Sequence, residues 1–341
     1  MPGEREQDSI ERPRLALIGP GRTRQGLGPF LAAFAEEAGA RVEVLVGRDA
    51  ARTRSAAEAL AAKLGHELRC YGSMESAFAQ ERLDAVLIAS PIASHLPALE
   101  RALAHGLHIL CEKPMIWGLS EASEHARRIV AEAQRQRRHL WINAQWPWTL
   151  PAYDQLHPGV RREAKQSFEF LLAPISRGWE KVPDALPHAF SLLQASSETP
   201  GQLLAPRFVL HDPKQTRVSV HFGWRSGERC LDVHVELVHG LEVPRPAAYA
   251  FDGHWAHRQV SMPSYEMAFH CDGRQLPYPD PSRQLVHDFV RALQQGQAPV
   301  AQDAAVQRIE MLETLEATWC SQFGCSQFGN PSSRQPRGES L

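Results

Sequence analysis

Short apolar runs alternate with amphipathic stretches over the first 145 residues. Five runs without polar alternation cover residues 14–19, 41–46, 84–90, 107–112 and 139–145. Stretches with helical spacing follow the first four, at residues 28–39, 49–65, 94–106 and 120–136. Apolar strands joined through amphipathic helices are typical of a parallel sheet that is buried on both faces. We therefore predict an α/β domain over residues 1–145, a Rossmann-like doubly wound parallel sheet.

The pattern changes after Trp146. Short runs with period-two character, separated by Gly, Pro and Asp, cover residues 165–173, 207–212, 216–224, 229–240, 246–253, 255–262 and 266–273. Such runs predict an antiparallel sheet. Helical stretches lie at residues 182–195, 282–296 and 304–319. We predict a second domain over residues 146–320, and a disordered tail over the polar residues 321–341.

Composition narrows the class of protein. The chain of 341 residues is 43% apolar and 22% charged, and its net charge of −2 provides no large basic patch for a nucleic acid. No apolar run approaches the roughly 20 residues that span a membrane, and the polar first residues do not resemble a secretory signal. The six cysteines form no CxxC pair, so we expect reduced thiols and no metal site. We predict a cytoplasmic protein with a small-molecule substrate.

The turn after the first strand is rich in glycine. Gly19 and Gly21 fit the tight turn and the close backbone approach of a dinucleotide-binding fingerprint. The third position of that fingerprint is Arg24, so the match is incomplete. The alternative is an ordinary glycine-rich loop. However, the turn lies between a strand and the N-terminus of a helix, and this position favours binding of a pyrophosphate.

The end of the second strand indicates which dinucleotide is bound. An acidic residue there would contact the ribose 2′-hydroxyl of NAD, whereas this chain has Gly47 followed by Arg48. Glycine leaves room for a 2′-phosphate and arginine can pair with it, and Arg22 adds positive charge nearby. We therefore favour NADP over NAD. The alternative is that Arg48 is a solvated surface side chain.

The fourth strand ends in two opposite charges, Glu112 and Lys113, followed by Pro114. Ligands of open α/β sheets bind outside the carboxyl ends of the strands, so this pair lies where a nicotinamide is expected. Proline restricts the residue before it to extended conformations. The alternative is a surface ion pair, but a lysine held in this way is a candidate for proton transfer.

Residues 90–115 resemble the central signature of the Gfo/Idh/MocA family, named for glucose–fructose oxidoreductase and inositol dehydrogenase. The signature has Ser or Thr before Pro, a His that opens the next helix, and Glu-Lys-Pro after the following strand. The matching residues are Ser90, Pro91, His95, Glu112, Lys113 and Pro114. The resemblance extends over roughly residues 14–320. Together with Gly19, Gly21, Arg22 and Arg48 of the turns described above, the signature residues Ser90, Pro91, His95, Glu112 and Lys113 are our candidates for the cofactor site.

The family resemblance also implies a second α/β domain with a large, open, mainly antiparallel sheet that often mediates oligomers, so we expect a homo-dimer or homo-tetramer. It implies that the lysine of Glu-Lys-Pro is catalytic, assisted by an Asp and a His on a helix of the second domain. Asp184 and His188 match these two, because they are four residues apart and could share one helical face. Either Lys113 or His188 carries the proton that leaves or joins the substrate oxygen.

Some residues near the expected substrate site differ from the usual pattern of the Gfo/Idh/MocA family. Asn143 and Trp146 follow the last strand of the first domain and are candidate substrate contacts, or alternatively residues that end the strand and pack the domain junction. Trp179 precedes Asp184 and His188, between Arg177 and Lys181. This segment could recognise an anionic substituent or be a mobile loop.

Three functions remain open from the sequence. The first is an NAD(P)-dependent oxidoreductase that acts on the CH–OH group of a sugar, cyclitol or related small molecule. The second is a reductase of an imine or of a non-sugar carbonyl in a biosynthetic pathway. The third is a cofactor-binding regulator without turnover. The presence of all three candidate catalytic residues argues against it: Lys113, Asp184 and His188.

Overall fold

The computed structural model describes residues 10–20, 27–162, 165–262 and 266–324. These residues form two compact units. The first unit contains the described residues up to Asn143 together with Ser282–Val306, and the second contains Ala144–Pro281 together with the described residues from Gln307 onward. The chain therefore returns to the first unit after most of the second is complete.

The first unit contains a six-stranded sheet in the order β3-β2-β1-β4-β5-β6, and every neighbouring pair is parallel. This strand order is that of the Rossmann fold, so the predicted doubly wound domain is confirmed. Four central strands are buried along almost their whole length, which explains their unbroken apolar runs. The strands are β1 (Arg14–Ile18), β2 (Arg41–Val46), β3 (Arg69–Tyr71), β4 (Ala85–Ile88), β5 (His108–Cys111) and β6 (Leu140–Ile142).

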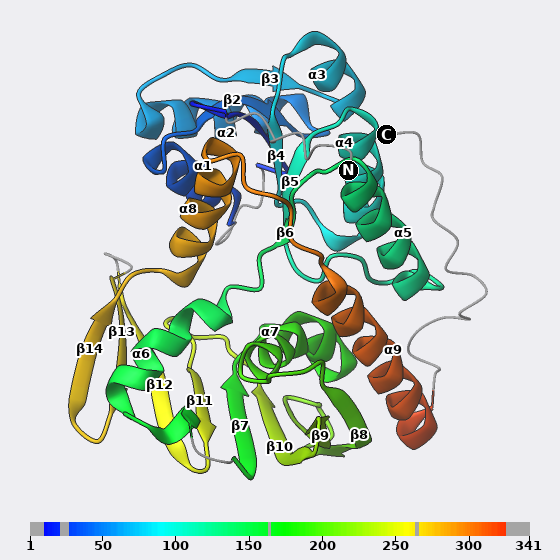
Figure 1. The fold of residues 1–341 in the computed structure, drawn as a ribbon, viewed down its shortest axis with the longest axis vertical. Helices are drawn as coiled ribbons and strands as arrows, with labels where there is room; N and C mark the ends of the chain where they lie inside the picture. The colour runs from blue at the N-terminus through cyan, green and yellow to red at the C-terminus, as the bar shows by residue number, and fades with distance from the viewer. Residues whose placement is uncertain (1–9, 21–26, 163–164, 263–265, 325–341) are drawn as a thin grey trace, which may run out of the picture. The chain divides into compact units, whose positions relative to one another are not determined.

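Helices cover both faces of this sheet (Figure 1). On one face α4 and α5 pack together, and on the other α1 lies beside α8, where Arg283 donates to Glu37 at 2.8 Å. The Trp141 ring of β6 also contacts the Phe289 ring of α8 edge-on at 5.9 Å. The helices are α1 (Gly28–Glu37), α2 (Ala50–Leu64), α3 (Met74–Gln80), α4 (His95–Ala104), α5 (Ala122–Arg135) and α8 (Pro281–Gln294).

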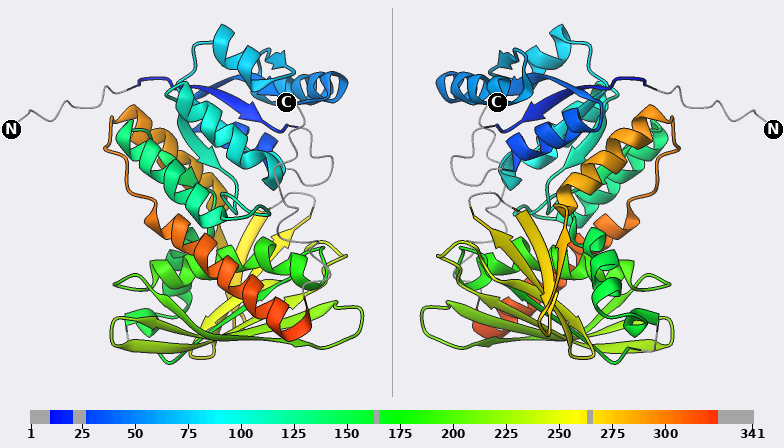
Figure 2. Two further views of the ribbon diagram at one scale, coloured as in Figure 1. Left: turned by 90° about the vertical axis from the view of Figure 1, so that its right-hand side faces the viewer. Right: turned by 90° about the vertical axis from the view of Figure 1, so that its left-hand side faces the viewer.

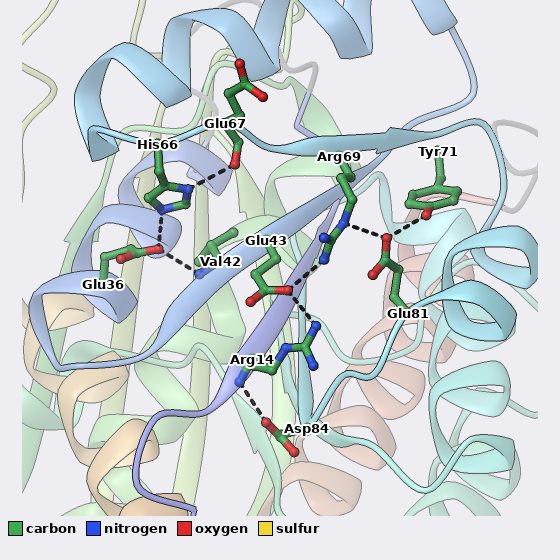
Figure 3. A network of polar contacts seen from close by, with 10 residues as sticks. All are labelled: Arg14, Glu36, Val42, Glu43, His66, Glu67, Arg69, Tyr71, Glu81 and Asp84. Atoms are coloured by element: carbon green, nitrogen blue, oxygen red, sulfur yellow. Dashed lines mark hydrogen bonds and ion pairs between the residues drawn. The ribbon is translucent and has the colours of Figure 1, made fainter.

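A network of charged side chains joins three strands of the sheet to α3 and its flanking residues (Figure 3). Arg14 and Arg69 donate to the same carboxylate oxygen of Glu43, at 2.8 and 2.7 Å, and Arg69 also pairs with Glu81 at 2.6 Å. Burial alone would raise the pKa of Glu43, but Arg14 and Arg69 hold it below its usual value. The backbone N–H of Arg14 donates to Asp84 at 2.8 Å.

Two elements of the first unit were not predicted. Strand β3 has only three residues, all at least partly exposed, so no apolar run marks it. Helix α3 follows Ser73, whose hydroxyl accepts from the backbone N–H of Ser76 at 3.2 Å as an N-cap.

The second unit contains an eight-stranded open sheet in the order β14-β13-β12-β11-β7-β10-β9-β8. Only β7 and β10 pair in parallel, and the other neighbouring pairs are antiparallel, so the predicted fold class is confirmed. The strands are β7 (Ser167–Leu172), β8 (Gln202–Leu210), β9 (Arg217–Ser226), β10 (Arg229–Val238), β11 (Ala247–Phe251), β12 (His254–Ser261), β13 (Glu266–Cys271) and β14 (Arg274–Tyr278). Strand β14 was not predicted, because Pro277 interrupts its pattern, and it lies at the sheet edge where proline is tolerated.

One face of this sheet carries the helices α6 (Leu150–Leu156), α7 (Lys181–Ala195) and α9 (Asp303–Phe323), as Figure 2 shows for α7 and α9. Phe222 of β9 points to this side and contacts Phe190 of α7 at 5.9 Å. The alternate positions, such as His221 and His234, form what we call the outer face of the sheet. Helix α6 is short and was not predicted, and α9 extends to Phe323, so residues 321–323 of the predicted tail are helical.

The cysteines differ in part from expectation. Cys70, Cys111, Cys230 and Cys271 are free thiols, but Cys320 is disulfide-bonded to a partner outside the described residues. The expectation that all six thiols are reduced is therefore wrong. Among the described residues, no helix is long and apolar enough to cross a bilayer. The same residues contain no group of three or more metal-ligating side chains.

Candidate functional site

A cavity of about 300 Å³ opens where β1, β2 and β4 end. Gly19 closes β1 with a backbone φ of +85°, and a Cβ atom there would lie 2.5 Å from Cα of Ser90. Only glycine allows this close approach of the first turn to the end of β4. The cavity is lined by Ile18, Gly19, Pro20, Val46, Gly47, Arg48, Asp49, Arg52, Thr53, Gly72, Ser73, Met74, Glu75, Ser90, Pro91 and Ser94. Its size and its place at the strand ends fit part of a dinucleotide.

The wall formed by β2 has no acidic side chain at its tip. A Cβ atom on Gly47 would lie 2.4 Å from Oγ1 of Thr53, so Thr53 occupies the space that a side chain there would need. Asp49 is the nearest carboxylate along the chain, and it caps α2 by accepting from the backbone N–H of Arg52 at 2.9 Å. The exposed side chains of Arg48 and Arg52 line the cavity. Sequence reasoning missed Arg52, although it follows Arg48 by one helical turn.

Ser90 and Pro91, which follow β4, also line this cavity. The hydroxyl of Ser94 lies 2.7 Å from that of Ser90 and donates to the carbonyl of Pro91 at 2.7 Å. His95 is fully buried, with Nε2 2.9 Å from the Ser90 carbonyl and Nδ1 3.0 Å from the Pro114 carbonyl. His95 therefore ties the Ser90 backbone to that of Pro114. Gly21 and Arg22, which we predicted in the turn after the first strand, lie outside the described residues.

Glu112 and Lys113 directly follow β5, which neighbours β4 in the sheet. Both side chains are half-buried, and the peptide bond between Lys113 and Pro114 is cis. Asn143 is fully buried and donates its side-chain amide to the carboxylate of Glu112. Asn143 therefore contacts Glu112 and helps to hold the loop that carries Lys113.

Asp184 and His188 both lie on α7 of the second unit. Asp184 is exposed in the first turn of the helix, whereas His188 is 6% exposed one turn further on. The helix continues through Pro187, and the His188 carbonyl accepts from the hydroxyl of Ser191 at 2.7 Å. The spacing of four places the two side chains on one side of the helix.

Trp146, a predicted substrate contact, is 3% exposed, so the structure makes it a core residue that packs among the aromatic side chains near His188. Its ring lies 6.1 Å from the His188 ring and packs edge-on against Phe170 and Tyr249, at 5.1 and 6.0 Å. The guanidinium carbon of Arg258 lies 5.6 Å from the centre of the Trp146 ring. Trp146 therefore links the helix that carries His188 to the eight-stranded sheet.

The segment before α7 is a 3₁₀ turn, Gly178–Glu180, rather than an irregular loop. Trp179 is 4% exposed, and its ring packs against those of Phe208 and Trp319 at 6.3 and 5.8 Å. The structure therefore makes Trp179 a core residue among these rings and gives it no exposed face for a substrate. Lys181 is fully buried, and burial lowers its pKa to about 8.

About two fifths of the chain matches known proteins. Residues 14–144 match the model of the oxidoreductase family with an NAD-binding Rossmann fold, Gfo/Idh/MocA. An inositol 2-dehydrogenase of Corynebacterium glutamicum is 40% identical over 146 residues, which are 42% of this chain and 39% of that protein. A D-xylose 1-dehydrogenase (NADP⁺) of Haloferax volcanii is 39% identical over 74 residues, 22% of each chain. The match thus spans about two fifths of the inositol dehydrogenase and less of the xylose dehydrogenase.

The fold as a whole also has solved counterparts. The crystal structure of GenD2 from gentamicin A biosynthesis, in complex with NAD, superposes with a TM-score of 0.69 at 17% identity. The superposition covers 94% of this chain and 97% of that chain, so both units have the same fold as this neighbour. The cavity at the ends of β1, β2 and β4 lies within residues 14–144. Residues 14–144 therefore match the NAD-binding Rossmann domain of the Gfo/Idh/MocA family of oxidoreductases.

Proposed function

We propose that this protein is an NAD(P)-dependent oxidoreductase that acts on a secondary alcohol or carbonyl of a sugar, cyclitol or related small molecule. The observation that carries the proposal is the cavity beside Gly19, Gly47 and Ser90, next to the strand end that carries Lys113. The name of the inositol dehydrogenase relative supports a polyhydroxylated substrate. A cytoplasmic location is part of this proposal.

The cofactor that we favour is NADP. The cavity lining includes two exposed arginines, Arg48 and Arg52, while its carboxylates are engaged elsewhere: Asp49 caps α2 and Glu75 pairs with Arg101. Arginine pairs well with a phosphate, whereas a carboxylate at the tip of β2 would favour the ribose hydroxyl of NAD. The relative named a D-xylose dehydrogenase (NADP⁺) agrees with this choice.

The bound nicotinamide would supply or accept the hydride. We assign Lys113 the task of holding an ammonium group against the reacting oxygen, or of accepting its proton. His188 is the alternative proton carrier, because imidazole exchanges protons near neutral pH. Asp184 would orient His188 or contact a substrate hydroxyl, and Asn143 holds Glu112 in the loop that precedes Pro114.

Cofactor binding and turnover test the proposal separately. Titration of the fluorescence of NADPH and NADH should show a preference for NADPH that falls by about 10-fold or more in Arg48→Ala. An unchanged preference would exclude the proposed role of Arg48. In a screen of sugars, inositols and keto compounds, Lys113→Ala and His188→Ala should each lower the rate by about 10²–10⁴.

The matched control is Lys214→Ala, a lysine in the turn between β8 and β9, which should retain the wild-type rate. Full activity in both Lys113→Ala and His188→Ala would contradict the assignment. Tight cofactor binding without turnover of any compound would favour a regulator without catalysis.

A further inference from the structure

His95 is the first residue of α4, and its side chain is fully buried. Nδ1 of its ring lies 3.0 Å from the carbonyl oxygen of Pro114, and Nε2 lies 2.9 Å from the carbonyl oxygen of Ser90. Ser90 lines the cofactor cavity, whereas Pro114 directly follows Lys113. One imidazole therefore joins the lining of the cavity to the loop that carries the proposed catalytic lysine.

The two carbonyl groups determine which ring atoms of His95 carry hydrogen. A carbonyl oxygen only accepts hydrogen bonds, so each ring nitrogen must donate in order to make its bond. Neutral imidazole has a single N–H, whereas both nitrogens of an imidazolium are donors. In a neutral ring, the lone pair of one nitrogen would point at a carbonyl oxygen. Both bonds of His95 can therefore exist together only in the cationic form of the ring.

The energy of burial is consistent with this form. A cation that leaves water is costly, but hydrogen bonds from a charged donor contribute about 1.5–3 kcal/mol each and offset that cost. The neutral ring would instead leave one ring nitrogen and one carbonyl unsatisfied. Ser90 and Pro114 are both buried, so each unsatisfied group would cost about 1–3 kcal/mol.

Other titratable groups lie on the segments around α4, and most are already paired. One ion pair connects α4 to α3 and another connects it to α5. In the segment that ends β5, a carboxylate accepts from a buried amide, and burial raises the pKa of the preceding thiol, which is therefore neutral. These groups are Glu75 with Arg101, Glu100 with Arg128, Glu112 with Asn143, the thiol of Cys111, and Lys113.

We propose that His95 is a positioning residue that works as an imidazolium. Its two N–H groups hold the cofactor cavity and the Lys113 loop in one arrangement, and loss of the second proton releases one of the two. An ordinary histidine is mostly neutral at pH 7.5, so His95 differs from the unfolded chain in holding this proton. The inference rests on the proposed function, in which Lys113 contacts the reacting oxygen.

Nitrogen-15 NMR of histidine side chains in the cofactor-free protein tests the protonation state without turnover. At pH 7.5 both ring nitrogens of His95 should give the signals of N–H groups, and one should lose its hydrogen as the pH rises towards 10. The signals are assigned by their loss in a His95 variant. A neutral ring with one N–H at pH 7.5 would overturn the proposal.

Two neutral substitutions separate the two bonds. The amide of asparagine reaches the position of Nδ1, so His95→Asn keeps a donor for Pro114 and loses the one for Ser90. The longer glutamine reaches the position of Nε2, so His95→Gln keeps the donor for Ser90 and loses the one for Pro114. We expect His95→Asn to weaken NADPH binding by about 10-fold. His95→Gln should bind NADPH as the wild type does, but its kcat should fall by about 10–100-fold.

The pH dependence of kcat distinguishes an imidazolium from a ring that only fills space. With the best substrate of the screen, the ratio of the wild-type rate to the His95→Gln rate should be largest at pH 7.5. It should shrink towards pH 10, because the wild type then loses the proton that the variant never had. A ratio that stays constant over this range would contradict the proposal.

His66 provides the matched control, because its ring also lies between two acceptors. Nδ1 is 3.0 Å from the Glu67 carbonyl and Nε2 is 2.8 Å from the Glu36 carboxylate, and His66 does not line the cofactor cavity. His66→Gln should leave NADPH binding and kcat unchanged.

Equal losses of NADPH binding and of kcat in both His95 variants would also overturn the proposal. If neither variant folds, the NMR measurement on the wild type still decides it. Failure of the proposed function has a different signature, because no compound would then be turned over while the imidazolium signals of His95 persist.

Discussion

Lys181 is the clearest case of a single residue whose burial conflicts with its charge. It is fully buried at the start of α7, and among the described residues its Nζ has no hydrogen-bond partner. Burial lowers its pKa to about 8, an effect that Arg177 strengthens and that Asp212 and Asp184 oppose. An ordinary lysine in the unfolded chain titrates about two units higher.

We predict that Lys181→Met stabilises the protein at pH 7, by on the order of 1–3 kcal/mol. Below pH 8 both states of the wild-type chain are protonated, so the native state bears the full cost of the buried charge. Between about pH 8 and 10.5 the native state has lost its proton and the unfolded state has not, so wild-type stability rises with pH. The advantage of Lys181→Met should therefore shrink over that range.

Urea unfolding of both proteins at pH 7, 8.5 and 10 measures this effect. The exposed Lys214→Met is the matched control, with little expected change. A difference between wild type and Lys181→Met that stays constant from pH 7 to 10 would show that the charge of Lys181 is not the cause.

At the scale of elements, a buried pair of histidines, His108 and His139, connects β5 to the residue that precedes β6. His108 of β5 accepts through Nδ1 from the backbone N–H of His139 at 2.9 Å, and the two rings are 5.2 Å apart. Nε2 of His139 lies 3.0 Å from the carbonyl of Gln297, which follows α8. Burial, followed by the nearby His139 and Arg138, lowers the pKa of His108 to about 3.

Acid should therefore destabilise the first unit through His108. Below its ordinary pKa near 6.5 the unfolded chain binds a proton that native His108 does not, so stability falls as the pH falls from 6.5 towards 3. His108→Asn keeps an oxygen that can accept from His139 but removes the titrating ring. Between pH 7 and 5 the wild type should lose about 1–2 kcal/mol more than this variant.

Thermal unfolding at pH 7 and pH 5 provides the comparison, with the exposed His254→Asn as control. If wild type and His108→Asn lose equal stability on acidification, another group is responsible for the acid sensitivity.

At the scale of the whole molecule, the outer face of the eight-stranded sheet is the main surface without helices in the second unit (Figure 2). It carries ring pairs between neighbouring strands: His221 stacks on His234 at 4.4 Å, and His257 lies 5.2 Å from His270. Trp255 is partly exposed and stacks on His257 at 5.7 Å. We propose that this face joins copies of the chain into a homo-dimer or homo-tetramer.

Light scattering after size exclusion tests the assembly. The wild type should be dimeric or tetrameric at micromolar concentration, and Trp255→Glu should shift it towards the monomer, because a carboxylate is costly to bury in an interface. Glu228→Gln, in the turn between β9 and β10, is the control. A monomeric wild type, or an intact oligomer in Trp255→Glu, would exclude this face as the interface.

The sequence by itself determined the elements that carry a strong apolar period. The unbroken runs of β1, β2, β4 and β5 predicted the buried parallel sheet, since a strand covered on both faces needs apolar residues at every position. Gly19, Ser90 and Lys113 could be assigned to strand ends for the same reason. Short elements such as β3, α3 and α6 escaped prediction because their few residues form no period.

The tertiary structure alone decided which distant residues meet. The pairing of Asn143 with Glu112, the contact of Arg258 with Trp146 and the return of α8 to the first unit join residues that lie far apart in the chain. The sequence pattern also did not predict that Lys181 and Trp179 are buried. Solvent exposure and partners depend on how strands and helices pack, and the local pattern of apolar and polar residues does not encode that packing.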